Sequence, residues 1–78
     1  MNEKDIIRAA MNVRGYNQTI LAEQAGLKRQ TNVSEMLRSR SIRVDNFVKL
    51  LGAMGFEVIV KDKNSANKEN VWKVGGAE

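Results

Sequence analysis

The chain has 78 residues, of which 13 are Lys or Arg and 9 are Asp or Glu, so its formal net charge is +4. It contains no cysteine and no histidine, which excludes disulfides and thiolate metal sites and removes the commonest metal ligand and general base. A chain of this length forms a single domain at most, and self-association is a common source of extra stability at this size. We therefore expect a homodimer without metal or cofactor.

The N-terminus is charged, and no apolar run approaches the roughly 20 residues that span a bilayer or looks like a signal peptide. Secretion and membrane insertion are not expected, which predicts a cytoplasmic protein. The first predicted helix begins after Asn2, a good N-cap residue, carries Asp5 in its first turn and ends at Gly15. Its predicted buried side consists of Ile6, Ile7, Ala10, Met11 and Val13.

Two short helices are predicted next, joined by a tight turn. Asn17 is a suitable N-cap for the first of them, and Gly26 ends it, because glycine adopts the left-handed conformation at little cost. Ala22 provides the small residue needed where two helices cross. The second helix has an apolar stripe of Val33, Met36 and Leu37, while its other face carries Gln30, Thr31, Ser34, Glu35 and Arg38.

The last predicted helix runs from about Val44 to Met54 and ends at Gly55. The segment before it, residues 38–43, is too polar to lie in the core apart from Ile42. The apolar residues of the helix, Val44, Phe47, Val48, Leu51 and Met54, follow a period of 3.6, and Leu50 widens the stripe. The core predicted from all helices comprises Leu21, Ala22, Leu27, Val33, Met36, Leu37, Phe47, Val48 and Leu51.

After Gly55 the hydrophobic period changes from 3.6 to 2, which predicts a β-strand over residues 56–62. A lone strand leaves a row of backbone groups unpaired, so an antiparallel ribbon with a second chain is one expectation. The alternative is a hairpin in which residues 71–74 fold back through a loop at 64–70, and both arrangements can hold at once. Trp72 is expected to be buried. The predicted dimer interface consists of Phe56, Val58, Ile59 and Val60.

The positive charge is concentrated in one segment of the chain. The charges of residues 1–27 sum to zero, and so do those of residues 44–78. The whole excess of +4 therefore lies in residues 28–43, around the second of the two short helices. A polyanion that releases counterions on neutralisation would bind there. The five cations, Lys28, Arg29, Arg38, Arg40 and Arg43, are the candidates for contacting the phosphates of such a polyanion.

The string Gly15-Tyr16-Asn17-Gln18, followed by Leu21-Ala22, Ala25-Gly26-Leu27 and Val33-Ser34, resembles the Cro/phage-repressor (XRE-type) helix-turn-helix family over roughly residues 5–55. The resemblance implies a mainly α, compact lambda-repressor-like domain, which agrees with the four to five helices predicted above and places the DNA-binding part at 1–55. The strand pattern adds a dimerisation strand at 56–62, followed by a loop and tail at 63–78 that include the second strand considered at 71–74. The family usually has its apolar recognition-helix residue at the position of Asn32. Here that residue is Val33, which indicates one extra residue in the turn.

The resemblance implies that Asn17 and Gln18 hold the DNA backbone, since helix N-termini bind phosphates. Amide side chains can pair with adenine, and a carboxylate can accept from cytosine N4. For Glu35 the alternative is an ion pair with Arg29 or Arg38. The candidate base contacts are Gln30, Thr31, Asn32, Ser34 and Glu35.

The predicted function is a sequence-specific transcriptional regulator, a repressor that binds a pseudo-palindromic operator in double-stranded DNA as a dimer. Two alternatives use the same fold. One is the antitoxin of a toxin–antitoxin pair, whose terminal segment would bind a toxin partner, and the other is a protein-interaction module that has lost DNA binding. An enzyme is not expected, because Gly75-Gly76 has no following helix to make a phosphate loop and no catalytic constellation is present.

Overall fold

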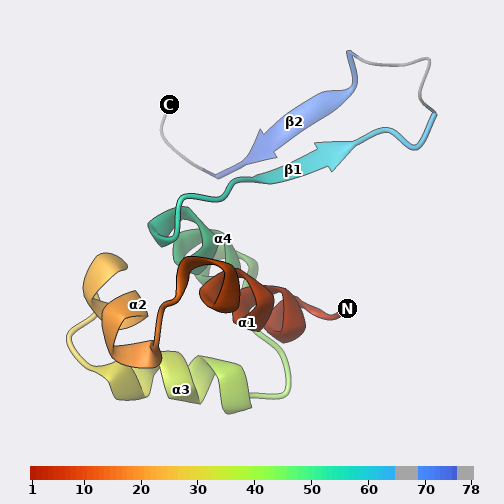
Figure 1. Ribbon diagram of the computed structural model, residues 1–78. Coiled ribbons are helices and arrows are strands. Elements are labelled where there is room, and N and C mark those ends of the chain that lie inside the picture. Colours follow the sequence, from red (N-terminus) through yellow and green to blue (C-terminus); the bar gives the residue numbers. More distant parts are fainter. Residues whose placement is uncertain (65–68, 76–78) are drawn as a thin grey trace.

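The computed structural model describes residues 1–64 and 69–75, except for the side chain of Gln30. Of the predicted loop and tail, residues 65–68 and 76–78 lie outside the described part. Four helices precede a two-stranded antiparallel sheet, so the fold is mainly α as expected (Figure 1). No helix in the described ranges is both long and apolar enough to cross a bilayer. The elements are α1 (Glu3–Arg14), α2 (Gln18–Gln24), α3 (Gln30–Arg38), α4 (Val44–Ala53), β1 (Val58–Lys61) and β2 (Val71–Val74).

Helix α1 begins at the predicted N-cap. Asn2 Oδ1 accepts a hydrogen bond from the Asp5 backbone N–H at 2.9 Å, and Asp5 Oδ2 accepts one from the Asn2 N–H at 3.3 Å. This reciprocal capping box satisfies two backbone donors of the first turn. Ile7 and Ala10 are buried, whereas Ile6 is 37% and Val13 70% exposed. The predicted burial of Ile6 and Val13 was wrong, because both lie beside the stripe that meets the other helices.

Helices α2 and α3 form the predicted pair. Asn17 Oδ1 accepts from the Ile20 N–H at 2.8 Å and caps α2. At the other end Gly26 has φ 74°, and the Leu27 N–H donates to the Ala22 carbonyl at 2.8 Å. This left-handed C-terminal motif turns the chain sharply toward α3.

The apolar side of α3 has the register expected from the extra turn residue. Val33 is fully buried, whereas Asn32 is only partly buried. The two residues therefore lie on different sides of the helix, and Val33 is the one that faces the core.

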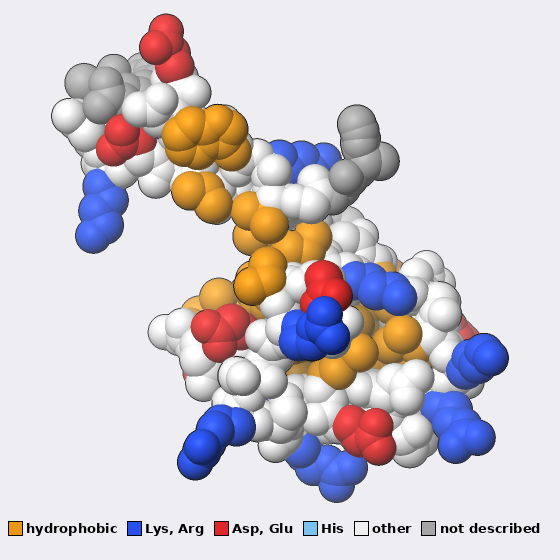
Figure 2. Space-filling model, turned by 180° about the vertical axis from the view of Figure 1, so that it is seen from behind, with side chains coloured by type: hydrophobic (Ala, Val, Ile, Leu, Met, Phe, Trp, Pro, Cys, Tyr) orange, Lys and Arg blue, Asp and Glu red, His pale blue; other side chains and the backbone are white. Residues whose placement is uncertain are grey.

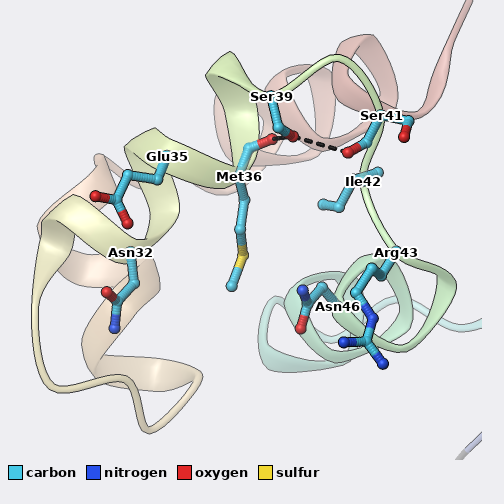
Figure 3. Close-up of a pocket in the computed structure, with 8 residues that line it drawn as sticks. All are labelled: Asn32, Glu35, Met36, Ser39, Ser41, Ile42, Arg43 and Asn46. Atoms are coloured by element: carbon cyan, nitrogen blue, oxygen red, sulfur yellow. Dashed lines mark hydrogen bonds between the residues drawn. The ribbon is translucent and has the colours of Figure 1, made fainter.

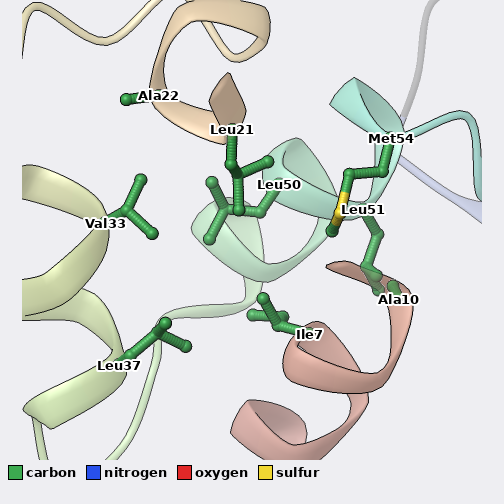
Figure 4. Packing of buried hydrophobic residues seen from close by; sticks show 9 residues of the cluster. All are labelled: Ile7, Ala10, Leu21, Ala22, Val33, Leu37, Leu50, Leu51 and Met54. Atoms are coloured by element: carbon green, nitrogen blue, oxygen red, sulfur yellow. The ribbon is translucent and has the colours of Figure 1, made fainter. Parts of the chain in front are cut away.

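The core lies where the four helices meet, and Figure 4 shows side chains from all of them pointing toward a common centre. Leu50 is fully buried, although the sequence pattern placed it only at the margin of the apolar stripe of α4. Leu51 and Met54 of the predicted stripe are buried, whereas Phe47 and Val48 are only partly buried and Val44 is 69% exposed, so the buried side of α4 is centred nearer to Leu50 than predicted. Leu27 and Met36 also lie at the edge of the core. The fully assembled cluster is Ile7, Ala10, Leu21, Ala22, Val33, Leu37, Leu50, Leu51 and Met54.

The end of α1 is tied to the end of α4 by an arginine that the sequence did not single out. Arg14 Nε donates to the Met54 carbonyl at 2.8 Å, and its guanidinium lies 4.3 Å from the centre of the Phe56 ring. The Phe56 N–H donates to the Leu51 carbonyl at 2.9 Å. Phe56 therefore completes the end of α4, which is why the strand begins at Val58 rather than at residue 56.

Strand β1 pairs with β2 of the same chain, so the hairpin alternative is the one present. The register places Val58 opposite Val74 and Val60 opposite Trp72. The hairpin projects from the helical body on the side away from α3 (Figure 1). Trp72 is 60% exposed, so its predicted burial was wrong: the pairing places it on the projecting part of the hairpin, beyond the reach of α4.

The base of the hairpin packs closely on α4 at Gly75. A Cβ at this position would lie 2.8 Å from Val48 Cγ1, and Gly75 has φ 69°. Gly75→Ala is therefore expected to lower the free energy of unfolding by about 1–3 kcal/mol through overpacking and left-handed strain. Gly52→Ala is the matched control, because Gly52 lies in α4 with no atom near its missing Cβ. That change should raise the free energy of unfolding by about 0.5–1 kcal/mol. Urea unfolding followed by circular dichroism checks both, and equal effects of the two changes would contradict the docking of Gly75 on α4.

Candidate nucleic-acid interface

The exposed face of α3 is polar. Thr31, Glu35 and Arg38 are exposed and follow one another at helical spacing, so they form a single row along the helix. Val33 and Leu37 lie on the opposite side and are buried in the core. The apolar stripe thus presses α3 against the helical body and orients the polar row outward.

Two further base-contact candidates flank this row and are partly buried. The Ser34 hydroxyl donates to the Thr31 carbonyl at 3.0 Å, so its lone pairs remain to accept a hydrogen bond. Asn32 lies on the other flank, beside Met36. The fifth candidate, Gln30, begins α3, but its side chain lies outside the described part of the structure.

An open groove separates α3 from the start of α4, and Figure 3 shows the side chains around it. The Ser39 hydroxyl lies 2.7 Å from the Met36 carbonyl and 2.8 Å from the Ser41 carbonyl, which holds the chain as it leaves α3. Asn46 reaches the groove from the first turn of α4. Asn46 was not among the residues predicted from the sequence, because only the placement of α4 across the groove from α3 brings it there. The lining residues are Asn32, Glu35, Met36, Ser39, Ser41, Ile42, Arg43 and Asn46.

The predicted phosphate-binding cations are all exposed. Arg43 Nε pairs with Asp45 Oδ1 at 3.3 Å, which is the single ion pair found among the described residues. Both side chains are well exposed, and exposed pairs of this kind are weak, so Arg43 can exchange Asp45 for a phosphate at small cost. Glu35 forms no ion pair with Arg29 or Arg38.

Two cations of α1 brace the C-terminal end of α3. Lys4 Nζ donates to the Ser39 carbonyl at 2.6 Å, and an Arg8 guanidinium nitrogen donates to the Leu37 carbonyl at 3.4 Å. Positive charge is favourable beside these carbonyls, where the helix dipole is negative. The sequence gives little indication of these two contacts. Lys4 and Arg8 are one turn apart on α1, but their partners are about 30 residues away in the chain.

The start of α2 holds the remaining two candidates. The side-chain oxygen of Asn17 is engaged in capping, which leaves its NH₂ group to donate. Gln18 is exposed and lines a shallow groove together with Arg8 and Tyr16. Both residues are exposed at the surface rather than buried in the core.

No protein-family model, no curated protein and no solved structure matches this chain. A functional assignment therefore depends on the residues and their geometry.

Proposed function

We propose that the protein binds double-stranded DNA sequence-specifically through α3 and represses transcription from a pseudo-palindromic operator as a homodimer. The observation that carries the proposal is the coincidence of two features: an outward polar row on α3, and a charge excess of +4 confined to residues 28–43. The order and pairing of α2 and α3 in a body of four helices support a lambda-repressor-like arrangement.

Helix α3 has suitable dimensions for the major groove. Its nine residues span about 13 Å, and the groove is about 12 Å wide and admits a helix. Lys28 and Arg29 precede the helix, and Arg38 and Arg40 lie at its other end. Cations at both ends of an inserted helix would reach phosphates on both walls of the groove, while the row between them meets base edges.

In the proposed complex with DNA, Glu35 contacts a base rather than a phosphate. Its carboxylate projects from the exposed face without an ion pair to Arg29 or Arg38, and it would repel phosphates. Cytosine N4 is the donor that such a carboxylate accepts from in the major groove. Thr31 and Asn32 would contact neighbouring bases.

A dimer would place two copies of α3 in successive major grooves, with half-sites about 34 Å apart. Strand β1 pairs with β2 of its own chain, so it needs no strand of a second chain to satisfy that edge. Two of the residues proposed for the dimer interface remain well exposed, Ile59 at 50% and Val60 at 51%, while Phe56 and Val58 are partly buried against the helices. The homodimer proposed here would therefore use surface that β1 and β2 leave exposed.

The decisive experiment is selection of bound duplexes from a random-sequence pool, followed by titration of the enriched sequence over a series of salt concentrations. Enrichment of a two-fold-related motif, with affinity that falls steeply as salt rises, is expected. Absence of both enrichment and salt-dependent binding would overturn the proposal.

Single substitutions should separate base readers from phosphate contacts. Thr31→Ala is expected to reduce discrimination at one base-pair position by about 1 kcal/mol and to leave binding to unrelated duplexes unchanged. Arg40→Ala should weaken all sequences about fivefold at 0.15 M salt and reduce the salt slope by about 0.9. Titrating each variant against the selected site and its single-base variants checks both, and the reverse pattern would show that the two roles were assigned to the wrong residues.

A further inference from the structure

One face of the hairpin is entirely apolar. The strand register places Val58, Val60, Trp72 and Val74 on this face, while Ile59, Lys61, Val71 and Lys73 share the other. The half nearer the helices is partly buried against α4, but Val60 is 51% and Trp72 60% exposed. A two-stranded hairpin is marginally stable by itself in water, so an uncovered apolar face of this kind calls for a partner.

A groove between α4 and the end of β2 continues this surface. It has a volume of about 570 Å³ and is lined by Val44 and Val48 of α4 and by Val74 of the hairpin. Val44 is 69% exposed, although it begins an amphipathic helix. Figure 2 shows the hydrophobic side chains running along the hairpin and down to the helical body. The molecule therefore carries a projecting apolar face and an apolar hollow side by side.

The exposed area is large for a chain of this size. The chain exposes 5778 Å², whereas a compact monomer of 8.8 kDa exposes about 4,800 Å². This total is taken over the whole chain, and the excess of about 1,000 Å² is of the same order as the roughly 800 Å² that each partner buries in a standard protein interface. The radius of gyration, 13.6 Å, likewise exceeds the roughly 11.5 Å expected for 78 residues.

Charge and position favour a second copy as the occupant. Residues 44–78, which include α4 and the hairpin, have no net charge, so two such surfaces meet without net repulsion. The hairpin lies on the opposite side of the helical body from α3, which leaves the proposed DNA-binding face free (Figure 1). A projecting face beside a hollow is self-complementary under a two-fold axis, as a symmetric dimer requires.

We propose that two copies of this chain dimerise through this surface, with Trp72 and Val60 of each copy packing on Val44 and Val48 of the other. The inference deepens the proposed function by naming its dimer surface, and it does not depend on DNA binding. In this dimer the two copies contact each other through side chains of the hairpin face. Pairing of strand edges, as in the ribbon expected from the sequence, is not needed.

Sedimentation of the full chain over a range of concentrations, without DNA, tests the proposal. Trp72 is the sole tryptophan of the sequence, so its fluorescence reports directly on the surface. The expected result is a concentration-dependent dimer whose formation shifts the emission to shorter wavelength as the indole leaves water. Trp72→Thr and Val44→Glu should each raise the dimer dissociation constant at least tenfold. Val44→Glu places an acidic residue in the first turn of α4, where it does not disfavour the helix.

Val71→Thr is the matched control, because Val71 is 41% exposed on the other face of the same strand. It should change the dissociation constant less than twofold, and circular dichroism should show that all three variants stay folded. A monomer at every concentration, or a dimer in which Trp72 emission does not change, would overturn the proposal. A monomer at every concentration would indicate that a different protein covers this surface. A dimer without a change in Trp72 emission would indicate that the two copies pair through the free edge of β1. Loss of DNA binding with an intact dimer would overturn only the proposed function.

Discussion

Replacing Lys28, Arg29 and Arg40 together by glutamine is expected to weaken binding to the selected duplex about a hundredfold at 0.15 M salt. Each phosphate contact contributes about 0.9 to the slope of log affinity against log salt, so three lost contacts reduce the slope by about 2.7. The three side chains are exposed at the two ends of α3 and contribute nothing to the core, which makes their loss electrostatic rather than structural. Titration by fluorescence anisotropy at several salt concentrations measures both quantities.

The control for this experiment removes the same charge elsewhere. Lys61, Lys63 and Lys73 are exposed on the hairpin, far from α3, and their joint replacement by glutamine lowers the net charge equally. Binding should then change less than about threefold, since surface charges beyond the screening length of roughly 8 Å contribute little. Equal losses in the two triple variants would mean that net charge, and not the surface around α3, attracts the DNA.

Leu50→Ala is expected to lower the free energy of unfolding by about 3–5 kcal/mol, enough to leave a domain of this size marginally folded. Leu50 is fully buried, and its removal leaves a cavity where α4 meets the other helices (Figure 4). Urea unfolding followed by circular dichroism gives the midpoint and the slope.

Val13→Ala is the comparison for Leu50→Ala. Val13 lies near the end of α1 and is 70% exposed, so its loss should change the free energy of unfolding by no more than about 0.5 kcal/mol. A small effect of Leu50→Ala would show that Leu50 does not fill the core where the four helices meet.

Much of the secondary structure follows from local sequence. Asn2 and Asn17 cap their helices with their own side chains, and Gly26 ends α2 in the left-handed conformation. These features involve residues within a few positions of one another, so they can be recognised without knowing the rest of the fold. The strand at β1 was likewise indicated by a period of 2, and its return at 71–74 was one of the two arrangements predicted for pairing it.

Burial was predicted less well, because it depends on which side of each element meets the others. Val44 and Trp72 are apolar and were placed inside, yet both are more than half exposed. Leu50 was placed at the margin of its stripe and is fully buried. An apolar period gives the direction of a helix face only approximately, and the neighbours decide which residues it covers.

The candidate site shows the same division. The charge excess and the polar residues of α3 were evident from the sequence. The support from Lys4 and Arg8, the ion pair of Arg43 with Asp45, and the position of Asn46 beside α3 were not. Most of these contacts join residues of different helices, and no local pattern specifies them.

The sequence by itself determined the helix boundaries near Asn2, Asn17 and Gly26, the change to strand after Gly55, and the location of the positive charge. Caps, periodicity and charge depend on residues that are close in the chain. Only the tertiary structure decided that the hairpin closes within one chain, that Trp72 lies on its exposed face and that α3 is braced from α1. These outcomes depend on the packing of distant segments, whose geometry is set by all the side chains at each contact together.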